Sequence, residues 1–321
     1  MIALIARRLL QLPLILGAVL LLTLALAWGV PGNPLERAER RPPAEVEAAM
    51  RAQYRLDSFW SFAWSYTLRA SGVRYAIDAR RGEPMDGRDV FDLGPSLQYR
   101  DQRVADIIVD ALPVSVSLGA AAIALALVIG VGAGVAGAVR PGGVLDALTL
   151  SLALVGISLP TFVVGTALLA LFAIVFGWAP VGGWGSLRSM LLPAATLSLP
   201  YAAYIARLTR VGMIEALRAD YVRTARAKGL PERTVIFRHA LRNALVPTVS
   251  YLGPACAGAM TGSFVVETVF SVPGMGQHFV SAVQNKDLFL LMGVVLVYAV
   301  ALVLLNLAAD VLVRVVDPRV S

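Results

Sequence analysis

Few residues of this chain have the type and spacing that catalysis or phosphate binding requires. The only lysines are Lys228 and Lys286, and neither follows a glycine as the lysine of a phosphate-binding loop does. The two histidines, His239 and His278, are too far apart in the sequence to suggest one metal site. Residues 156–160 approach the Gly-x-Ser-x-Gly pattern of serine hydrolases but end in proline. We therefore predict that the chain is not an enzyme and binds no metal or cofactor itself.

The residues that could contact a partner gather in a basic segment, residues 213–228. Read as a helix, this segment has arginines around one stripe of four side chains: Ile214, Leu217, Tyr221 and Ala225. Gly229 can end the helix, and Pro231 suits the first turn of a second helix that runs to about residue 243. The pattern predicts a helix–turn–helix projection. It would either lie on anionic lipid or fit a socket on another protein, and the compact turn favours the socket.

The elements that carry this segment are strongly apolar. The chain is 58% hydrophobic and 15% charged, and its mean hydropathy is +0.72, which is typical of proteins that cross a membrane several times. Uncharged runs long enough for a span lie between Arg8 and Glu36, Asp110 and Arg140, Asp146 and Arg188, Arg188 and Arg207, Arg242 and Glu267, and Asp287 and Asp310. We predict an all-α integral membrane protein with six transmembrane helices.

Two of these runs are expected to depart from a straight helix. The run after Asp146 is too long for one span, and its tail, residues 177–185, is predicted to be an exit loop with interfacial tryptophans. The next run contains Pro193 and Pro200, so we expect a kink there. Elsewhere, small residues four positions apart should let helices approach closely: Gly130 with Gly134, and Gly258 with Gly262.

The distribution of basic residues predicts the orientation of the spans. Arginines precede the first span, follow the second and fill residues 207–246, whereas the opposite short loops carry only Arg188 and Lys286. This asymmetry places both termini and the loop 207–246 in the cytoplasm. It also accounts for the net charge of +7 without any binding of nucleic acid. A signal peptide cleaved near Ala25–Ala27 is the alternative for the first span, but an even number of spans requires that this one is retained.

The predicted organisation has three parts: residues 1–30 with the first span, residues 31–106 as an external segment, and residues 107–321 as a core of five spans with the loop 207–246. In the external segment we expect a helix over residues 44–55 and an exposed loop over residues 79–89. The aromatic stretch at residues 59–66 is expected to anchor at the lipid headgroups or to serve as a docking surface.

Two motifs resemble one family of membrane proteins. The stretch Asp220-Tyr-Val-Arg-Thr-Ala-Arg-Ala-Lys-Gly-Leu230, followed by residues 239–247, resembles the signature loop of the membrane subunits of bacterial ABC importers. It departs from their generic Glu-Ala-Ala pattern in the way that the peptide/nickel branch does. The resemblance covers nearly the whole chain and is weakest around residues 72–90; it extends to residues 31–34, 267–276 and 317–319. Residues 92–101 and 182–184 are most similar to the first (B-type) membrane subunit of oligopeptide permeases.

The resemblance implies a type I ABC importer permease fold in the bacterial inner membrane and an assembly with other chains. A second, homologous permease subunit would complete the pathway, and an extracytoplasmic substrate-binding protein would deliver the peptide. Two ATPase subunits would bind ATP and Mg. The residues expected to couple this chain to the ATPases are Asp220, Tyr221, Arg223, Thr224, Ala225, Arg226, Ala227, Lys228, Gly229 and Leu230.

A second candidate site lies where the fifth span ends. Glu267, Phe270 and the turn at Pro273 and Gly274 are expected to form an outer gate or a docking site, or else simply to cap the end of the helix.

Two other functions remain open from the sequence. The same fold could import nickel, a metal chelate or glutathione. A self-sufficient secondary transporter would need ionisable groups in the middle of its spans or an inverted repeat, whereas Glu267 and Asp310 lie at span edges and no inverted repeat is evident.

Overall fold

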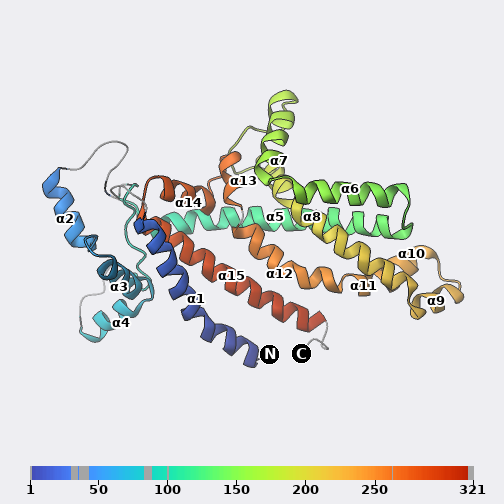
Figure 1. Ribbon diagram of the computed structural model, residues 1–321, viewed down its shortest axis with the longest axis horizontal. Coiled ribbons are helices and arrows are strands. Elements are labelled where there is room, and N and C mark those ends of the chain that lie inside the picture. Colours follow the sequence, from blue (N-terminus) through green and yellow to red (C-terminus); the bar gives the residue numbers. More distant parts are fainter. Residues whose placement is uncertain are drawn as a thin grey trace. The chain divides into compact units, whose positions relative to one another are not determined.

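The computed structural model describes residues 2–29, 35, 43–82, 89–99, 101–261 and 263–316, and the regular elements of these residues are helices (Figure 1). The chain forms two compact units. The first unit contains Met1–Ile5, Val114–Gly276 and Ala301–Ser321, and the second contains Ala6–Pro113 and Gln277–Val300. Three of the motifs above lie outside the described residues: residues 31–34, Gly262 and residues 317–319.

Several helices have the length and apolar composition that a membrane span requires. Within the described residues, five stretches meet this condition: Leu10–Gly29 of α1 (Ile2–Gly29), α5 (Val104–Val139), α8 (Leu187–Arg218), Val246–Val269 with α12 (Val246–Thr261) and α13 (Phe264–Val269), and Leu288–Val311 of α15 (Leu288–Val316). A sixth is counted if α6 (Val144–Ser158) and the helical run of α7 (Thr161–Leu168) and η1 (Leu169–Val175) form one bent span. The predicted all-α membrane fold is confirmed, with five candidate spans and one bent pair among the described residues.

The bent pair shows how the long third run is divided. Its two helical arms meet at an angle of 106°, and the chain is extended at Leu159 (φ −84°, ψ 131°), directly before Pro160. Steric contact with a following proline disfavours the helical conformation, so Leu159 is a natural break point. The predicted exit loop after Phe176 is also present. By contrast, α8 is helical throughout although it contains Pro193 and Pro200.

Glycines allow close helix contacts in the first unit. A Cβ added to Gly130 would lie 2.7 Å from the carbonyl oxygen of Ala202, and one added to Gly134 would lie 2.7 Å from that of Ala206. The backbones of α5 and α8 therefore approach too closely for a larger residue at either position. Gly258 of α12 similarly faces the hydroxyl of Tyr201. The predicted close approach of helix backbones is confirmed for Gly130 and Gly134, whereas Gly258 faces a side chain.

The second unit contains the helices that follow α1: α2 (Ala44–Tyr54), α3 (Phe59–Ala70) and α4 (Val73–Arg80). The predicted helix over residues 44–55 is thus confirmed to within one residue. The aromatic stretch forms α3, and its side chains Phe62 and Tyr66 are fully buried against Phe289 of α15. Residues 79–82 continue from α4 into a turn, and residues 83–88 of the expected exposed loop lie outside the described part of the chain.

A buried carboxylate holds the loop that leads into α5. Asp287 is fully buried and accepts hydrogen bonds from the hydroxyl of Ser96 and from the backbone amides of Leu97 (3.0 Å) and Gln98 (3.2 Å). Its other oxygen accepts from the amide of Leu290 (3.1 Å), in the first turn of α15. One side chain therefore caps a helix and anchors a loop that is distant in the sequence.

Candidate functional site

The basic segment folds into a projection, residues 219–244, that follows α8. The predicted single helix over residues 213–228 is wrong, because α8 ends at Arg218 and a new helix, α9 (Asp220–Ala227), begins after Ala219. Ala219 is extended (φ −72°, ψ 151°), and its carbonyl accepts the amides of Val222 (3.0 Å) and Arg223 (3.2 Å) as α9 starts. Asp220 lies in the first turn of α9, where a negative charge is favourable.

The predicted turn at Gly229 is present. Gly229 has φ of +76°, a conformation that favours glycine, and its amide donates to the carbonyl of Arg226 (2.9 Å). The return limb consists of α10 (Glu232–Thr234), a π-helical segment, η2 (Val235–Ala240), and α11 (Leu241–Ala244). The sequence predicted one second helix from Pro231 to about residue 243, and this limb is helical over that range with a change of helix type in the middle.

One face of α9 anchors the projection. Val222 and Ala225 are buried, and they belong to an apolar cluster with Met213 of α8 and with Val235 and Ala240 of the return limb. The position of these side chains explains the break at Ala219, since a straight continuation of α8 would not turn this face inward onto the return limb. Tyr221, which we expected on one stripe with Ala225, is 41% exposed, whereas Ala225 is buried.

The other face of α9 is open and polar. The side chains of Asp220 and Arg223 are 96% and 76% exposed, and Thr224, Ala227 and Lys228 are exposed as well. Of the ten residues that we expected to couple the chain to a partner, Ala225 is buried and Leu230 is partly buried; the other eight are exposed. The projection therefore has a fixed inner face and a free outer face.

Arg226 has a partner within the projection. Its guanidinium donates two hydrogen bonds to the carboxylate of Glu232, one of them from Nε at 3.2 Å, across the turn at Gly229. The hydrogen bonds from Arg226 hold the pKa of Glu232 below its usual value, and the same contacts raise the pKa of Arg226. Both side chains are partly solvent-exposed, so the pair adds little to stability. It links the two sides of the turn at Gly229.

The limbs that carry the projection are tightly joined. A Cβ on Gly212 of α8 would lie 2.5 Å from the carbonyl oxygen of Ala244, so α8 and α11 are in backbone contact. One helical turn toward the N-terminus of α8, the hydroxyls of Thr209 and Thr248 are hydrogen-bonded at 3.2 Å and buried. The projection is therefore joined closely to both α8 and α12.

A partly buried ion pair, which we did not predict from the sequence, joins α8 to α6. Arg210 donates to both carboxylate oxygens of Asp146, from Nη2 at 2.7 Å and also from Nε. The amide of Gly142, in the loop before α6, donates to the same carboxylate at 2.8 Å. Asp146 is only 3% exposed. Asp146 lay at the edge of an apolar run and Arg210 lay just beyond the Arg207 edge of another, but the sequence does not show that they pair.

The residues of the second candidate site also come together. Glu267 of α13 is fully buried, and its carboxylate accepts the hydroxyls of Ser115 (2.7 Å) and Ser263 and the amide of Gly276 (2.7 Å). A Cβ on Gly274 would lie 2.4 Å from this carboxylate. Phe270 is buried in the apolar core, and Pro273 is exposed. Figure 1 shows α13 beside the start of α8 and the projection at the other end of α8.

The comparisons with known proteins agree with this architecture. The family described as "Binding-protein-dependent transport system inner membrane component" matches residues 122–321. The oligopeptide transport system permease protein OppB of Escherichia coli (strain K12) is 40% identical over 292 residues, which is 90% of either chain. The dipeptide transport system permease protein DppB of Bacillus subtilis (strain 168) is 36% identical over 300 residues, 94% of this chain and 92% of the relative.

A solved structure supports the fold. A chain of the inward-facing MetNI methionine ABC transporter superimposes with a TM-score of 0.53 at 18% identity, and the match covers 66% of this chain and 97% of that one. The fold is therefore that of a type I ABC importer permease, and the apolar helices are those of a multi-pass inner membrane protein. The chain belongs to the family of inner membrane components of binding-protein-dependent transport systems, with B-type peptide permeases among its relatives.

Proposed function

We propose that this chain is the transmembrane permease subunit of an ATP-driven importer of oligopeptides or dipeptides. The support comes from the family match and from relatives that are named as oligopeptide and dipeptide permeases and align over about nine-tenths of their length. In this proposal the chain forms the pathway with a second, homologous permease subunit. An extracytoplasmic binding protein supplies the peptide.

Energy enters through other chains. Two ATPase subunits bind and hydrolyse ATP with Mg, and this chain takes no part in that chemistry. The observation that carries the proposal is the outer face of α9: a short helix, locked to α8 and to the return limb by Val222 and Ala225, presents its charged side to solvent. Such a face can bind a groove on an ATPase subunit.

The packing of the projection suggests how it transmits movement. The close contact of Gly212 with Ala244 and the bond of Thr209 to Thr248 join the two limbs below the projection. If the ATPases approach each other and pull on α9, α8 and α12 move as one body. A short rigid helix can transmit a rotation in this way, whereas a flexible basic tail cannot.

The sharpest test is charge reversal on the outer face. Arg223→Glu leaves the inner face untouched, because the Arg223 side chain is 76% exposed. We expect the chain to insert and fold normally, while peptide uptake by the reconstituted complex falls by about tenfold or more, since like charges across an interface cost several kcal/mol. Arg80→Glu, an exposed arginine of the second unit, is the matched control and should transport normally.

The measurement is peptide uptake together with co-purification of the ATPase subunits and ATP hydrolysis. Wild-type uptake by both Arg223→Glu and Tyr221→Ala would show that α9 is not the docking face. Arg226 is a poorer choice for this test, because its substitution breaks two hydrogen bonds to Glu232 across the turn. By contrast, the contact of Arg223 with Asp220 is a single exposed one at 3.5 Å on the outer face itself.

A further inference from the structure

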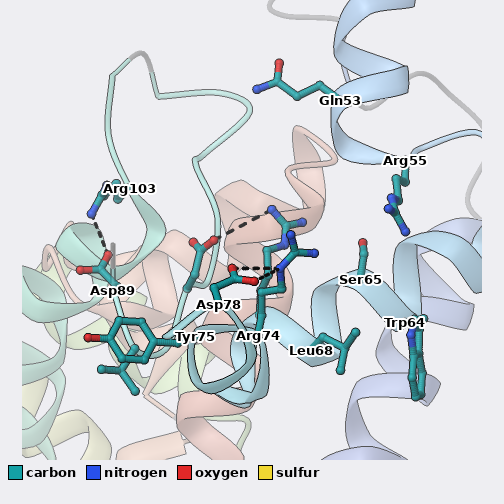
Figure 2. A pocket seen from close by; sticks show the side chains of 13 residues that line it. Gln53, Arg55, Trp64, Ser65, Leu68, Arg74, Tyr75, Asp78, Asp89 and Arg103 are labelled. Atoms are coloured by element: carbon teal, nitrogen blue, oxygen red, sulfur yellow. Dashed lines mark hydrogen bonds and ion pairs between the residues drawn. The ribbon is translucent and has the colours of Figure 1, made fainter. Parts of the chain in front are cut away.

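The second unit has a pocket that the transport proposal does not use. It is open to solvent, has a volume of about 500 Å³, and is lined by the end of α2, by α3 and α4, and by Asp89, Val90, Asp92 and Arg103. Figure 2 shows the side chains of Arg55, Ser65 and Trp64 on one side of this pocket and the pair of Arg74 and Asp78 in its centre.

The lining of the pocket contains one more arginine than aspartate. Arg74 donates from Nε to both oxygens of Asp78, at 3.1 and 3.2 Å, and Arg103 pairs with Asp89 at 2.7 Å. The third carboxylate, that of Asp92, has Arg69 at 4.0 Å. Arg55 follows α2 in the left-handed conformation (φ 55°), is exposed, and forms no ion pair among the described residues. The pocket therefore has an arginine available for an anionic ligand.

The edge of the pocket is apolar and aromatic. Trp60 and Trp64 lie one helical turn apart on α3 and are 72% and 66% exposed, and Trp64 also lines the pocket. The opposite face of α3 carries Phe62 and Tyr66 into the core of the unit. Two exposed tryptophans on one helix face, beside a cation, are typical of a protein surface at the membrane interface.

The level of α3 relative to the bilayer follows from its contact with a membrane span. Trp28 lies in the last turn of α1, and its ring packs on Phe59 and Phe62 with centroids 5.9 and 6.0 Å apart. These residues belong to one compact unit. Along α1 the side chains of Leu22 and Leu26 are 63% and 66% exposed, as expected of a surface that faces lipid. Helix α3 therefore starts at the level where α1 leaves the bilayer.

We propose that this pocket binds the headgroup of an anionic phospholipid, with Arg55 on the phosphate and with Trp60 and Trp64 in the interfacial layer. The lipid-facing surface of α1 is continuous with α3 through Trp28. The ligand nearest to the pocket is therefore a lipid of the same leaflet. The three internal Arg–Asp pairs shape the pocket, and Arg55 supplies the charge that distinguishes an anionic headgroup from a zwitterionic one.

The first experiment measures lipid retention by the full chain. The protein is purified in nanodiscs that contain phosphatidylcholine and phosphatidylglycerol, and the bound lipids are counted by native mass spectrometry after transfer to detergent. Arg55→Gln is expected to reduce retained phosphatidylglycerol about fivefold, the effect of one arginine near an anionic surface. Arg80→Gln, an exposed arginine outside the pocket, should retain it as the wild type does. Equal retention in Arg55→Gln and the wild type overturns the proposal.

The second experiment places the tryptophans. Fluorescence of the wild type, of Trp60→Phe/Trp64→Phe and of the control Trp178→Phe/Trp184→Phe is compared in nanodiscs with lipids brominated near the headgroup. The emission of Trp60 and Trp64 is the difference between the wild type and the first double variant. We expect bromine to quench this emission. Emission from Trp60 and Trp64 that is unaffected by bromine, but changes when the substrate-binding protein is added, would identify a protein docking surface and overturn the lipid site.

Discussion

At the scale of single residues, Glu267 illustrates how a buried charge becomes part of the structure. A carboxylate without partners in an apolar interior is strongly unfavourable, but here two serine hydroxyls and one backbone amide donate to it. One of these serines, Ser115, in turn accepts the amide of Met275 at 2.9 Å. The carboxylate thus joins α5, α13 and the turn at Gly274. This geometry favours the interpretation of Glu267 as a cap that holds the end of the helix.

Replacing Glu267 by glutamine tests that interpretation. The amide group is isosteric, but it is uncharged and its NH2 end cannot accept, so the serine hydroxyls must reorient and the bonds lose their charge-assisted strength. We expect the free energy of unfolding to fall by about 1–3 kcal/mol, measured as thermal unfolding in detergent. Thr268→Val is the matched control, because the Thr268 hydroxyl is exposed and bonds only its own helix, to the carbonyl of Phe264.

The opposite result would support the other role that we considered for Glu267, that of an outer gate. If Glu267→Gln has wild-type stability and loses transport, the carboxylate acts on the moving pathway and does not hold the fold.

At the scale of helices, close backbone contact decides the packing of the first unit. Gly130 and Gly134 allow α5 to lie directly on α8. In a membrane the hydrophobic effect does not drive helix association, so such van der Waals contacts carry much of the stability. Gly132, between the two, has open space where its Cβ would lie.

This difference gives a test within one helix. Gly134→Ala must separate α5 from α8 or distort them, because the new methyl group would lie 2.7 Å from the Ala206 carbonyl oxygen. We expect lower thermal stability, by about 1–3 kcal/mol as for other overpacked sites. Gly132→Ala should be neutral or stabilising by up to about 1 kcal/mol, since alanine favours the helix. Equal effects of the two substitutions would contradict the proposed contact.

The helices also show what could be predicted from the sequence. Apolar runs and the residues at their edges predicted the spans. Gly229 itself predicted the turn, and the four-residue spacing of Gly130 and Gly134 predicted the close contacts. They did not predict the break at Ala219, because alanine is the best helix former and only the burial of Val222 under the return limb overrides that preference. The bend before Pro160 was not predicted, because hydropathy reports how apolar a segment is and does not report where the helix axis changes direction. The pair of Asp146 and Arg210 joins residues 64 positions apart, which no local pattern reports.

At the scale of the whole molecule, the two candidate sites lie near opposite ends of α8. A helix of its 32 residues is about 48 Å long, longer than the apolar thickness of a bilayer. The outer face of α9 and the turn held by Glu267 therefore face different sides of the membrane if α8 spans it. The basic residues of the loop 207–246 predict that α9 faces the cytoplasm.

The proposed cargo is tested on the assembled transporter. With its binding protein present, the reconstituted complex should hydrolyse ATP faster when peptides of increasing length are offered than when chelated nickel or glutathione is offered. Stimulation by nickel alone would keep the fold and the role of α9 but overturn the peptide assignment. Failure of any ATPase to co-purify would remove the basis of the importer proposal itself.

The anchoring of Ser96 by Asp287 has a consequence for how the protein is made. The two residues are 191 positions apart, so a ribosome that adds about 5–20 residues per second needs about 10–40 s to supply the carboxylate after the serine. Throughout that interval the loop before α5 lacks its anchor, although α5 itself can already insert. The loop can acquire its final shape only when the start of the last span emerges, which makes completion of this unit a late step in biogenesis.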